Sequence, residues 1–253
     1  MTIPLQQGLI YGPVNSRRLG RSLGVNPLPR RFKVCTFNCV YCQYGWTHIH
    51  GDNLDDPALW PETEVILLAL ENTLKEILIQ PDYITFSGNG EPTLHPHFPQ
   101  LVEGVNHLRD RLAPRAKTAV LSNSTTVPKR SISRAIEKLD VRIMKLDCGN
   151  DQCFQKYNHP VKGIGLKQIV RALKTLKDVT IQSLFSGGAA GNYNSTNLQD
   201  WVAQILEIQP EMVQVYTLDR GYPSDEIYPV SRGDLQEIKQ KLTQAGVVAE
   251  IYT

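Results

Sequence analysis

Three cysteines stand close together in the first fifth of the sequence, at Cys35, Cys39 and Cys42. Three residues separate the first pair and two separate the second, so one tight loop can direct all three thiolates at a common centre. Three ligands from one loop suit a cuboidal iron-sulfur cluster with one iron left free of protein. A structural zinc site would need a fourth Cys or His.

The iron without a cysteine ligand gives this spacing its chemical interest. It can accept the amino and carboxylate groups of S-adenosylmethionine (SAM), which places the sulfonium for one-electron reduction and cleavage to methionine and a 5′-deoxyadenosyl radical. A ferredoxin-like electron carrier would use a fourth nearby cysteine, and the next one is Cys148. A zinc site that recruits His48 or His50 is the remaining metal alternative.

Further polar residues follow the apolar runs that we predict to be strands. The turn Ser87-Gly88-Asn89-Gly90-Glu91-Pro92 follows one run, and its glycines permit close approach of a ligand. The next run ends in Ser122 and Asn123, which suit either the hydroxyl and carboxylate groups of SAM or a helix cap. Gln182 lies on a later run, and Tyr216, Asp219 and Arg220 end the last one. We expect these residues to form a polar ring at the mouth of a site.

Lys145 and Asp147 end another predicted strand, and the period of two places them on the same side. Charged side chains inside a fold are costly unless they are paired or functional, so the two form either an internal salt bridge or part of a catalytic site. Lys145 could bind a carboxylate or form a Schiff base with a carbonyl substrate. Cys148 and Cys153 are too few for a second cluster, and we expect isolated thiols.

The elements that position these residues alternate between short apolar runs and longer segments with helical spacing, as in parallel β/α units. The predicted strands are 31–34, 83–86, 118–121, 142–146, 180–184 and 212–218. The predicted helices are one opening at Pro61 and five at about 99–112, 131–139, 166–177, 197–208 and 231–245. Six units are fewer than the eight of a closed barrel, so the sequence predicts an α/β fold, a partial (β/α)₆ TIM-like barrel with its site at the carboxyl ends of the strands.

The chain divides into an expected N-terminal arm, residues 1–30, rich in Gly and Pro, and a core domain, residues 31–253. No segment is apolar enough to span a bilayer or to act as a secretory signal, and the few, uneven cysteines do not suit a disulfide framework. We therefore expect a cytoplasmic protein that does not bind membranes.

Charge is unevenly distributed, although the net charge is only +2. Residues 1–51 contain no Asp or Glu but six basic residues: Arg17, Arg18, Arg21, Arg30, Arg31 and Lys33. These residues either attract an anionic partner such as RNA or pair with acids elsewhere in the fold. Both interpretations stay open.

The pattern Cys-x3-Cys-x-Tyr-Cys, with Tyr41 before the last cysteine, resembles the signature of the radical SAM superfamily. The resemblance implies that the three cysteines bind a [4Fe-4S] cluster and that Tyr41 lines the adenine site. Gly88, Gly90, Glu91 and Pro92 resemble the superfamily's Gly-Glu-Pro motif, which implies that this turn contacts the amino group of SAM. An electron donor such as flavodoxin or ferredoxin is implied as well.

Residues 11–27 and 216–220 are similar to a narrower group, the wyosine-synthetase-like Fe-S oxidoreductases. Its characterised members build a tricyclic base on a guanine of tRNA. The sequence has no cysteine before Cys35 for a second cluster and no flavodoxin-like domain, so we do not expect that reaction. The leading hypothesis is a radical SAM enzyme whose substrate is unidentified, with a nucleoside in tRNA as a candidate. The alternatives are an activase that places a glycyl radical on a protein and a non-catalytic metal- or RNA-binding module.

Overall fold

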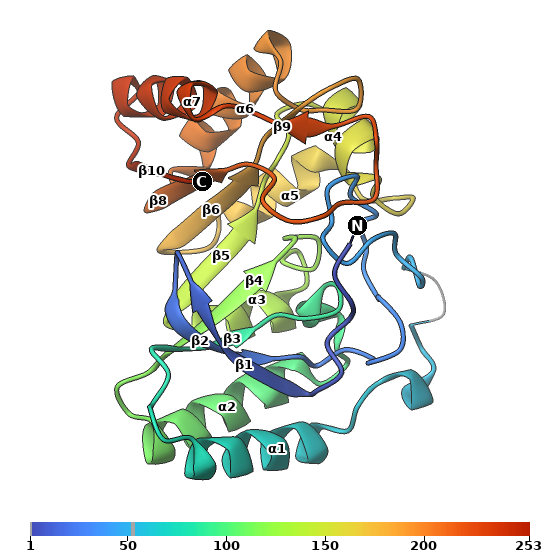
Figure 1. Ribbon diagram of the computed structural model, residues 1–253, viewed down its shortest axis with the longest axis vertical. Helices are drawn as coiled ribbons and strands as arrows, with labels where there is room; N and C mark the ends of the chain where they lie inside the picture. Colours follow the sequence, from blue (N-terminus) through green and yellow to red (C-terminus); the bar gives the residue numbers. More distant parts are fainter. Residues whose placement is uncertain (1, 52–53) are drawn as a thin grey trace.

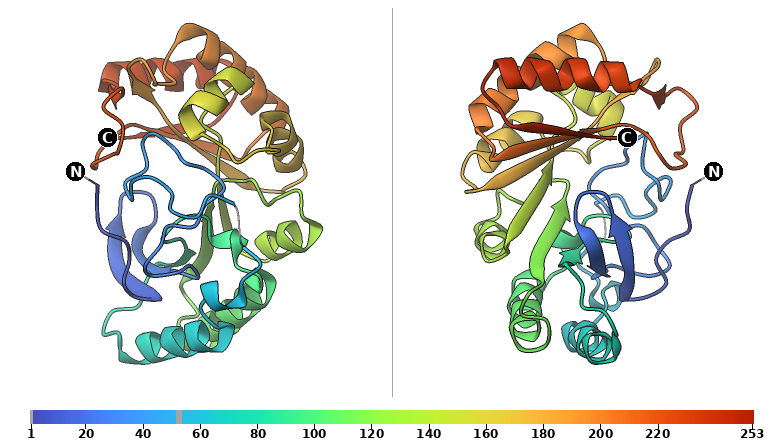
Figure 2. Two further views of the ribbon diagram at one scale, coloured as in Figure 1. Left: turned by 90° about the vertical axis from the view of Figure 1, so that its right-hand side faces the viewer. Right: turned by 60° about the vertical axis from the view of Figure 1, so that its left-hand side comes forward.

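A computed structural model describes residues 2–51 and 54–253 of the chain. Eight strands form one curved sheet in the order β1-β2-β3-β4-β5-β6-β8-β10. The β1–β2 pair is antiparallel, and each later pair is parallel. The helices cover the outer face of the sheet, and the sheet curls around the segment that follows β2 (Figures 1 and 2). This arrangement confirms the predicted partial barrel of α/β class.

The strands of this sheet are β1 (Ile10–Ser16), β2 (Gly20–Val25), β3 (Tyr83–Phe86), β4 (Lys117–Ser122), β5 (Val141–Lys145), β6 (Val179–Leu184), β8 (Met212–Tyr216) and β10 (Ala249–Tyr252). A separate pair consists of β7 (Ser186–Gly187) and β9 (Tyr228–Pro229). The α-helices are α1 (Thr63–Glu76), α2 (Phe98–Leu112), α3 (Arg130–Glu137), α4 (Asp151–Asn158), α5 (Leu166–Leu173), α6 (Ser195–Ile208) and α7 (Arg232–Gln244). Short 3₁₀ helices span Pro57–Leu59 and Pro92–Leu94.

Local sequence explains why the outer helices form and which face they bury. In α1, Ile66, Leu70 and Leu74 recur every four residues and are buried, so one stripe of the helix packs on the sheet. The start of α7 carries a capping box in which Ser231 and Asp234 satisfy each other's backbone N–H groups. Every residue of the central strand β6 is buried, as expected for a parallel strand that is covered on both faces.

The predicted strands from residue 83 onward are confirmed as β3, β4, β5, β6 and β8, and the six predicted helices are confirmed with shifted ends. The predicted strand at 31–34 is wrong. Val34 forms only isolated bridges, with Ile49 and with Gly90, and Arg31 and Phe32 are exposed. The first parallel strand is instead β2, which pairs with β3. Its glycines and the neighbouring prolines had indicated turns.

The β1–β2 hairpin lies within the proposed N-terminal arm, although β2 is a strand of the main sheet. The boundary between residues 1–30 and 31–253 therefore stays a prediction. The hairpin tip reaches the opposite side of the sheet, where Arg17 pairs with Asp219 at 2.5 Å and Arg18 lies over the rings of Tyr216 and Tyr252. These contacts bring the hairpin tip against the other end of the sheet. Among the described residues, no helix is long and apolar enough to cross a membrane.

Candidate active site

One cavity of about 680 Å³ lies inside the curve of the sheet. Its volume is in the range of about 300–1,000 Å³ that small-molecule sites occupy. Residues at the carboxyl ends of β3, β4, β5, β6 and β8 line it together with the loop that carries the three cysteines. The cavity therefore lies at the carboxyl ends of the strands, where the site was predicted, and the cysteine loop meets the strand ends there.

The three cysteines all line this cavity. Cys35 and Cys39 are each 8% exposed, and Cys42 is half-buried. The segment is a loop without regular structure, held in part by backbone bonds from Val34 to Asn89 and from Val40 to Tyr157. These two backbone bonds hold the loop just before Cys35 and just after Cys39, and so limit the directions in which these two thiols point.

The environment of the thiols fits a metal cluster. Burial raises the pKa of Cys35 to about 12 and that of Cys39 to about 11, so a bound cation would be needed to keep them ionised near neutral pH. Two side-chain amides donate hydrogen bonds to the sulfurs, from Asn123 to Cys35 at 3.5 Å and from Asn158 to Cys39 at 3.3 Å. Such donors to cluster sulfurs are a known means of tuning a cluster.

A single-ion site is a poorer fit. Within residues 2–51 and 54–253, no three His, Cys, Asp or Glu side chains converge closely enough to hold one metal ion. Three ligands of a cube bind three different irons, so their sulfurs lie farther apart than ligands of one ion do. His48 accepts a hydrogen bond from the backbone N–H of Lys33 at 3.3 Å, and neither His48 nor His50 lines the cavity. These observations weigh against the zinc alternative.

Lys33 lines the site, although the sequence indicated it only as one of the six basic residues within residues 1–51. It is 2% exposed, lines the cavity, and donates from Nζ to the carbonyl of Gly45 at 2.6 Å. Its position two residues before Cys35 was the available signal. Asn158 had no comparable signal, because α4 was not predicted.

Gly88 and Gly90 line the cavity with φ values of +145° and +136°. A Cβ atom on Gly88 would lie 2.1 Å from Oδ1 of Asn26, and one on Gly90 would lie 1.8 Å from the carbonyl oxygen of Val34. Only glycine allows this backbone path and this close approach. The turn therefore exposes peptide groups directly to the cavity. Pro92 follows as the start of a 3₁₀ helix and does not line the cavity.

Glu91 is 1% exposed and already has four hydrogen bonds. Its Oε1 accepts from the backbone and hydroxyl of Thr93 and from the Ser122 hydroxyl, and its Oε2 accepts from the backbone N–H of Asn123. Burial nevertheless raises the pKa of this carboxyl. The carboxylate ties the turn after β3 to the end of β4. Ser122 and Asn123 line the same cavity, as predicted for site residues.

Lys145 and Asp147 form the internal salt bridge that was one of the two alternatives, with Nζ 3.0 Å from Oδ1. Lys145 also donates to the Tyr216 hydroxyl at 2.9 Å and lines the cavity. Burial disfavours the ammonium, but Asp147 and Tyr216 outweigh it and raise the pKa of Lys145. The ion pair with Asp147 stabilises the ammonium form of Lys145, which can bind a carboxylate, whereas a Schiff base requires the neutral amine.

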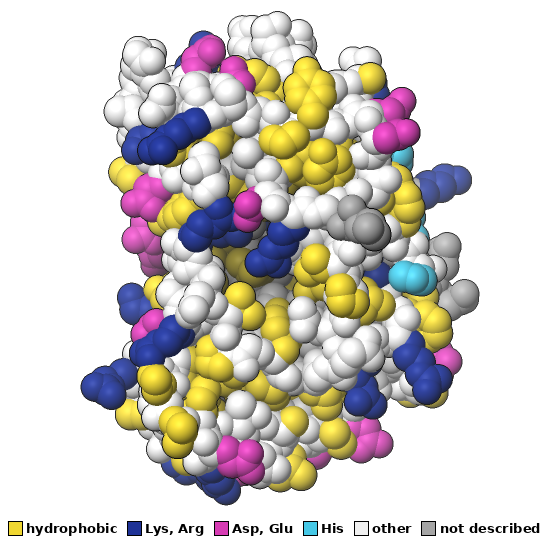
Figure 3. Space-filling model, viewed as in Figure 1, with side chains coloured by type: hydrophobic (Ala, Val, Ile, Leu, Met, Phe, Trp, Pro, Cys, Tyr) yellow, Lys and Arg dark blue, Asp and Glu magenta, His cyan; other side chains and the backbone are white. Residues whose placement is uncertain are grey.

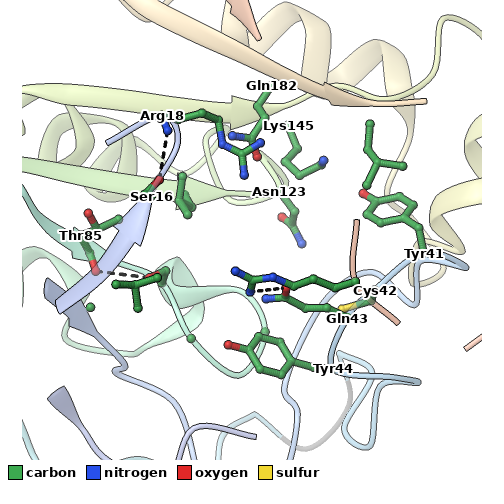
Figure 4. A pocket seen from close by; sticks show the side chains of 18 of the residues that line it. Ser16, Arg18, Tyr41, Cys42, Gln43, Tyr44, Thr85, Asn123, Lys145 and Gln182 are labelled. Atoms are coloured by element: carbon green, nitrogen blue, oxygen red, sulfur yellow. Dashed lines mark hydrogen bonds between the residues drawn. The ribbon is translucent and has the colours of Figure 1, made fainter. Parts of the chain in front are cut away.

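Asp147 lies behind the cavity wall and holds the cysteine loop. The Tyr41 hydroxyl donates to its Oδ2 at 2.5 Å, and Asn158 donates to the same oxygen at 3.0 Å. Tyr41 lines the cavity, and burial raises its pKa, so the phenol stays a neutral donor. Figure 4 shows Tyr41, Cys42 and Lys145 around one space.

The predicted polar ring is present in the cavity wall, where Gln182, Tyr216, Asp219 and Arg220 all lie. Gln182 donates to Gln214 at 3.1 Å and accepts from the Tyr216 hydroxyl at 3.3 Å.

Cys148 and Cys153 are free, as expected, but they are not isolated from each other, because their sulfurs lie 2.7 Å apart. The turn that enters α4 brings them together.

The six basic residues of the acid-free segment, residues 1–51, lie in different environments. Arg17 and Arg21 pair with Asp219 and Asp82, whereas Arg30 and Arg31 are exposed. Lys33 and Arg18 line the cavity.

A curved parallel sheet with a three-cysteine loop and a glycine turn on one cavity is the architecture of radical SAM enzymes. Residues 31–195 match the Radical SAM superfamily. A UPF0026 protein of Synechocystis sp. is 35% identical over 220 residues, which cover 85% of this chain and 77% of that protein. The chain belongs to the radical SAM superfamily and, within it, to the UPF0026 proteins.

Two more distant proteins are similar to this chain, one in sequence and one in fold. An S-adenosyl-L-methionine-dependent tRNA 4-demethylwyosine synthase of Pyrococcus abyssi is 22% identical over 71% of this chain and 56% of the synthase. This similarity confirms the resemblance to the wyosine-synthetase-like group. The crystal structure of a radical SAM methyltransferase from Sphaerobacter thermophilus shares the fold, with a TM-score of 0.67 and 14% identity over 91% of this chain and 65% of that chain. The chain is therefore a radical SAM enzyme, and its family implies SAM and an iron-sulfur cluster.

Proposed function

We propose that Cys35, Cys39 and Cys42 bind a [4Fe-4S] cluster at which SAM is reductively cleaved to methionine and a 5′-deoxyadenosyl radical, which removes a hydrogen atom from an unidentified substrate. The observation that carries the proposal is that the three thiols share one cavity with residues from five strand ends. When bound, the cluster supplies the electron for cleavage of the sulfonium.

The protein's own part is to bind and orient SAM. The exposed peptide groups at Gly88 and Gly90 are suited to the amino group of SAM, and Lys145 is suited to an anionic group in the same cavity. Glu91, with its four hydrogen bonds, positions Ser122 and Asn123 rather than acting as a free anion. Asp147 is a positioning residue, because it holds Lys145 and Tyr41 toward the cavity.

Tyr41 and Gln182 complete the proposed cofactor site. Both line the cavity from opposite parts of the chain, Tyr41 from the cysteine loop and Gln182 from β6. The ring of Tyr41 packs 4.9 Å from that of Tyr157, and Nζ of Lys145 lies 5.0 Å from its centroid, so this aromatic ring meets the cavity beside an ammonium.

Anaerobic reconstitution tests the proposal. The purified protein with iron, sulfide, dithionite and SAM is expected to turn brown and to form 5′-deoxyadenosine. A variant with Cys35, Cys39 and Cys42 all changed to Ala is the control. A colourless protein, or one that forms no 5′-deoxyadenosine, would contradict the proposed chemistry and favour the non-catalytic alternative.

We further propose a nucleoside in tRNA as a candidate substrate. Support comes from the similarity to the tRNA-modifying synthase and from the exposed Arg30 and Arg31 in the acid-free segment. Reversal of both charges is expected to weaken tRNA binding, with a shallower dependence of affinity on salt. Unchanged affinity would remove tRNA from consideration. Flavodoxin or ferredoxin remains the predicted electron donor.

A further inference from the structure

Arg18 presents an unsatisfied positive group inside the cavity. It lies at the tip of the β1–β2 hairpin, with its guanidinium carbon 4.5 Å from the ring centroid of Tyr216 and 5.7 Å from that of Tyr252. Its Nη1 atom is buried and has no hydrogen-bond partner within the described part of the chain. Arg18 lines the cavity, and among the described residues no carboxylate pairs with it, so its guanidinium is a group that an anionic ligand can neutralise.

Four more cations line this cavity: Arg17, Lys33, Lys145 and Arg220. Arg17 pairs with Asp219 and Lys33 donates to the Gly45 carbonyl, which leaves Lys145 and Arg220 to be considered with Arg18. Lys145 lies 5.0 Å from the same Tyr216 ring centroid, so Arg18 and Lys145 both contact one tyrosine. Arg220 also lines the cavity and donates to the neutral Oε1 of Gln43 at 2.8 Å. We call Arg18, Lys145 and Arg220 the cationic group. Figure 4 places Arg18 and Lys145 on the same side of the space, and Figure 3 shows Lys and Arg side chains beside a hollow on this face.

The acids of the cavity wall do not balance this charge. Among the described residues, the lining acids are Glu91 and Asp219. Glu91 is occupied by four uncharged donors, and Asp219 pairs with Arg17. Lys145 has its partner in Asp147. Within residues 2–51 and 54–253, no carboxylate forms an ion pair with Arg18 or Arg220.

We propose that Arg18 and Arg220, supported by Lys145, bind an anionic oxygen group of the substrate, either a carboxylate or a phosphate. This inference rests on the proposed function and narrows its substrate to a compound that carries such a group into the cavity. The planar guanidinium offers several N–H donors in a fixed geometry that matches both anions. The ring of Tyr216 keeps the Arg18 guanidinium in place.

Calorimetry on the reconstituted holoenzyme tests this site directly. With SAM at saturation, so that its own carboxylate site is filled, the protein is titrated under anoxic conditions with inorganic phosphate in one series and acetate in another. We expect one of the two probes to bind, and the probe that binds identifies the substrate group. Arg18→Gln should weaken that binding about tenfold to a hundredfold, as expected for loss of a charge-assisted hydrogen bond.

Arg21→Gln is the matched control, because Arg21 lies on the same hairpin, pairs with Asp82 and does not line the cavity. It should leave probe affinity unchanged, whereas Arg18→Lys should retain part of it. Arg220→Gln provides a second variant should Arg18→Gln fold poorly, and it is expected to weaken binding as well.

Three outcomes would overturn the inference: neither probe binds, Arg21→Gln weakens binding as much as Arg18→Gln, or the probe binds only when SAM is absent. The test is separable from that of the proposed function, because probe binding needs no radical chemistry. A protein that cleaves SAM but binds neither anion would lose only this inference. One that binds an anion through Arg18 but never forms 5′-deoxyadenosine would lose the proposed reaction instead.

Discussion

The cysteine loop and the cationic group lie on the same cavity but are assembled in different ways. The three cysteines fall within eight consecutive residues, so their convergence depends mainly on one loop. Arg18, Lys145 and Arg220 come from a hairpin tip, from β5 and from the segment after β8. They meet only when the sheet has curled and the hairpin tip has reached its other end. The residues proposed to bind the cofactor cluster are therefore brought together by one short segment, whereas those proposed to bind the substrate are brought together only by the whole fold.

The largest expected effect comes from removing one thiol of the cysteine loop. Cys39→Ala should reduce the iron content, the visible absorption and the formation of 5′-deoxyadenosine to background after anaerobic reconstitution, since a cube with two protein ligands is held poorly. Cys153→Ala is the control, because Cys153 does not line the cavity. Equal loss in both variants would remove the distinction between the two sets of cysteines.

A large effect on stability is expected at Asp147, which links the loop to the cationic group through Tyr41 and Lys145. Asp147→Asn leaves a buried ammonium without its counterion and should lower the free energy of unfolding by about 3–5 kcal/mol. Urea denaturation measures this loss. Adding Lys145→Met to the same variant should recover part of it. A loss near zero would mean that the two regions are not coupled through this pair.

A smaller, pH-dependent effect is expected at Glu91. Burial raises its pKa in the folded protein, so the native state holds the proton more tightly than the unfolded state does. Its contribution to stability is therefore greatest below the ordinary carboxyl pKa of about 4.3 and declines as pH rises through the raised value. Glu91→Gln lacks this decline.

Glu91→Gln should consequently cost less, relative to the wild type, at higher pH. Urea denaturation of both proteins across the acidic and neutral range measures the difference. A cost that grows with pH would mean that the folded protein favours the ionised carboxylate, contrary to the burial of this group.

The smallest effect is expected at the hairpin tip itself. Arg17 and Asp219 are 47% and 55% exposed, so their pair is screened by solvent. Asp219→Asn should change the free energy of unfolding by less than about 1 kcal/mol, and salt should reduce even that. A larger, salt-resistant loss in thermal or urea unfolding would show that the tip stabilises the fold as strongly as the buried pair does.

The same contrast explains what the sequence could predict. The cysteine triplet, the glycine turn and the ends of β3, β4, β5, β6 and β8 follow from spacing and periodicity, and all of them line the cavity, whereas periodicity did not predict β10. The first strand was misplaced, because Gly20 and Gly24 in β2 look like turn residues. Gly24 is needed there since the ring of Tyr11 occupies the space of a Cβ atom.

Roles that depend on distant partners could not be predicted in the same way. The sequence places Asp147 on the same side of the strand as Lys145, but it gives neither the position of Tyr216 nor the environment that this side faces, so it cannot decide between a salt bridge and a site residue. Arg18 was one of six equivalent basic residues in the sequence, and only the packing of its guanidinium on Tyr216 separates it from Arg17 and Arg21.

The contact between Gly90 and Val34 links the glycine turn after β3 to the cysteine loop. Val34 immediately precedes the first cysteine, and its backbone bonds to Asn89 and Glu91 on either side of that glycine. A methyl group at Gly90 would collide with the Val34 carbonyl and push the two segments apart. Gly90→Ala should therefore impair incorporation of iron, although Gly90 is not itself a ligand. The turn after β3 thus holds the residues before Cys35 in position.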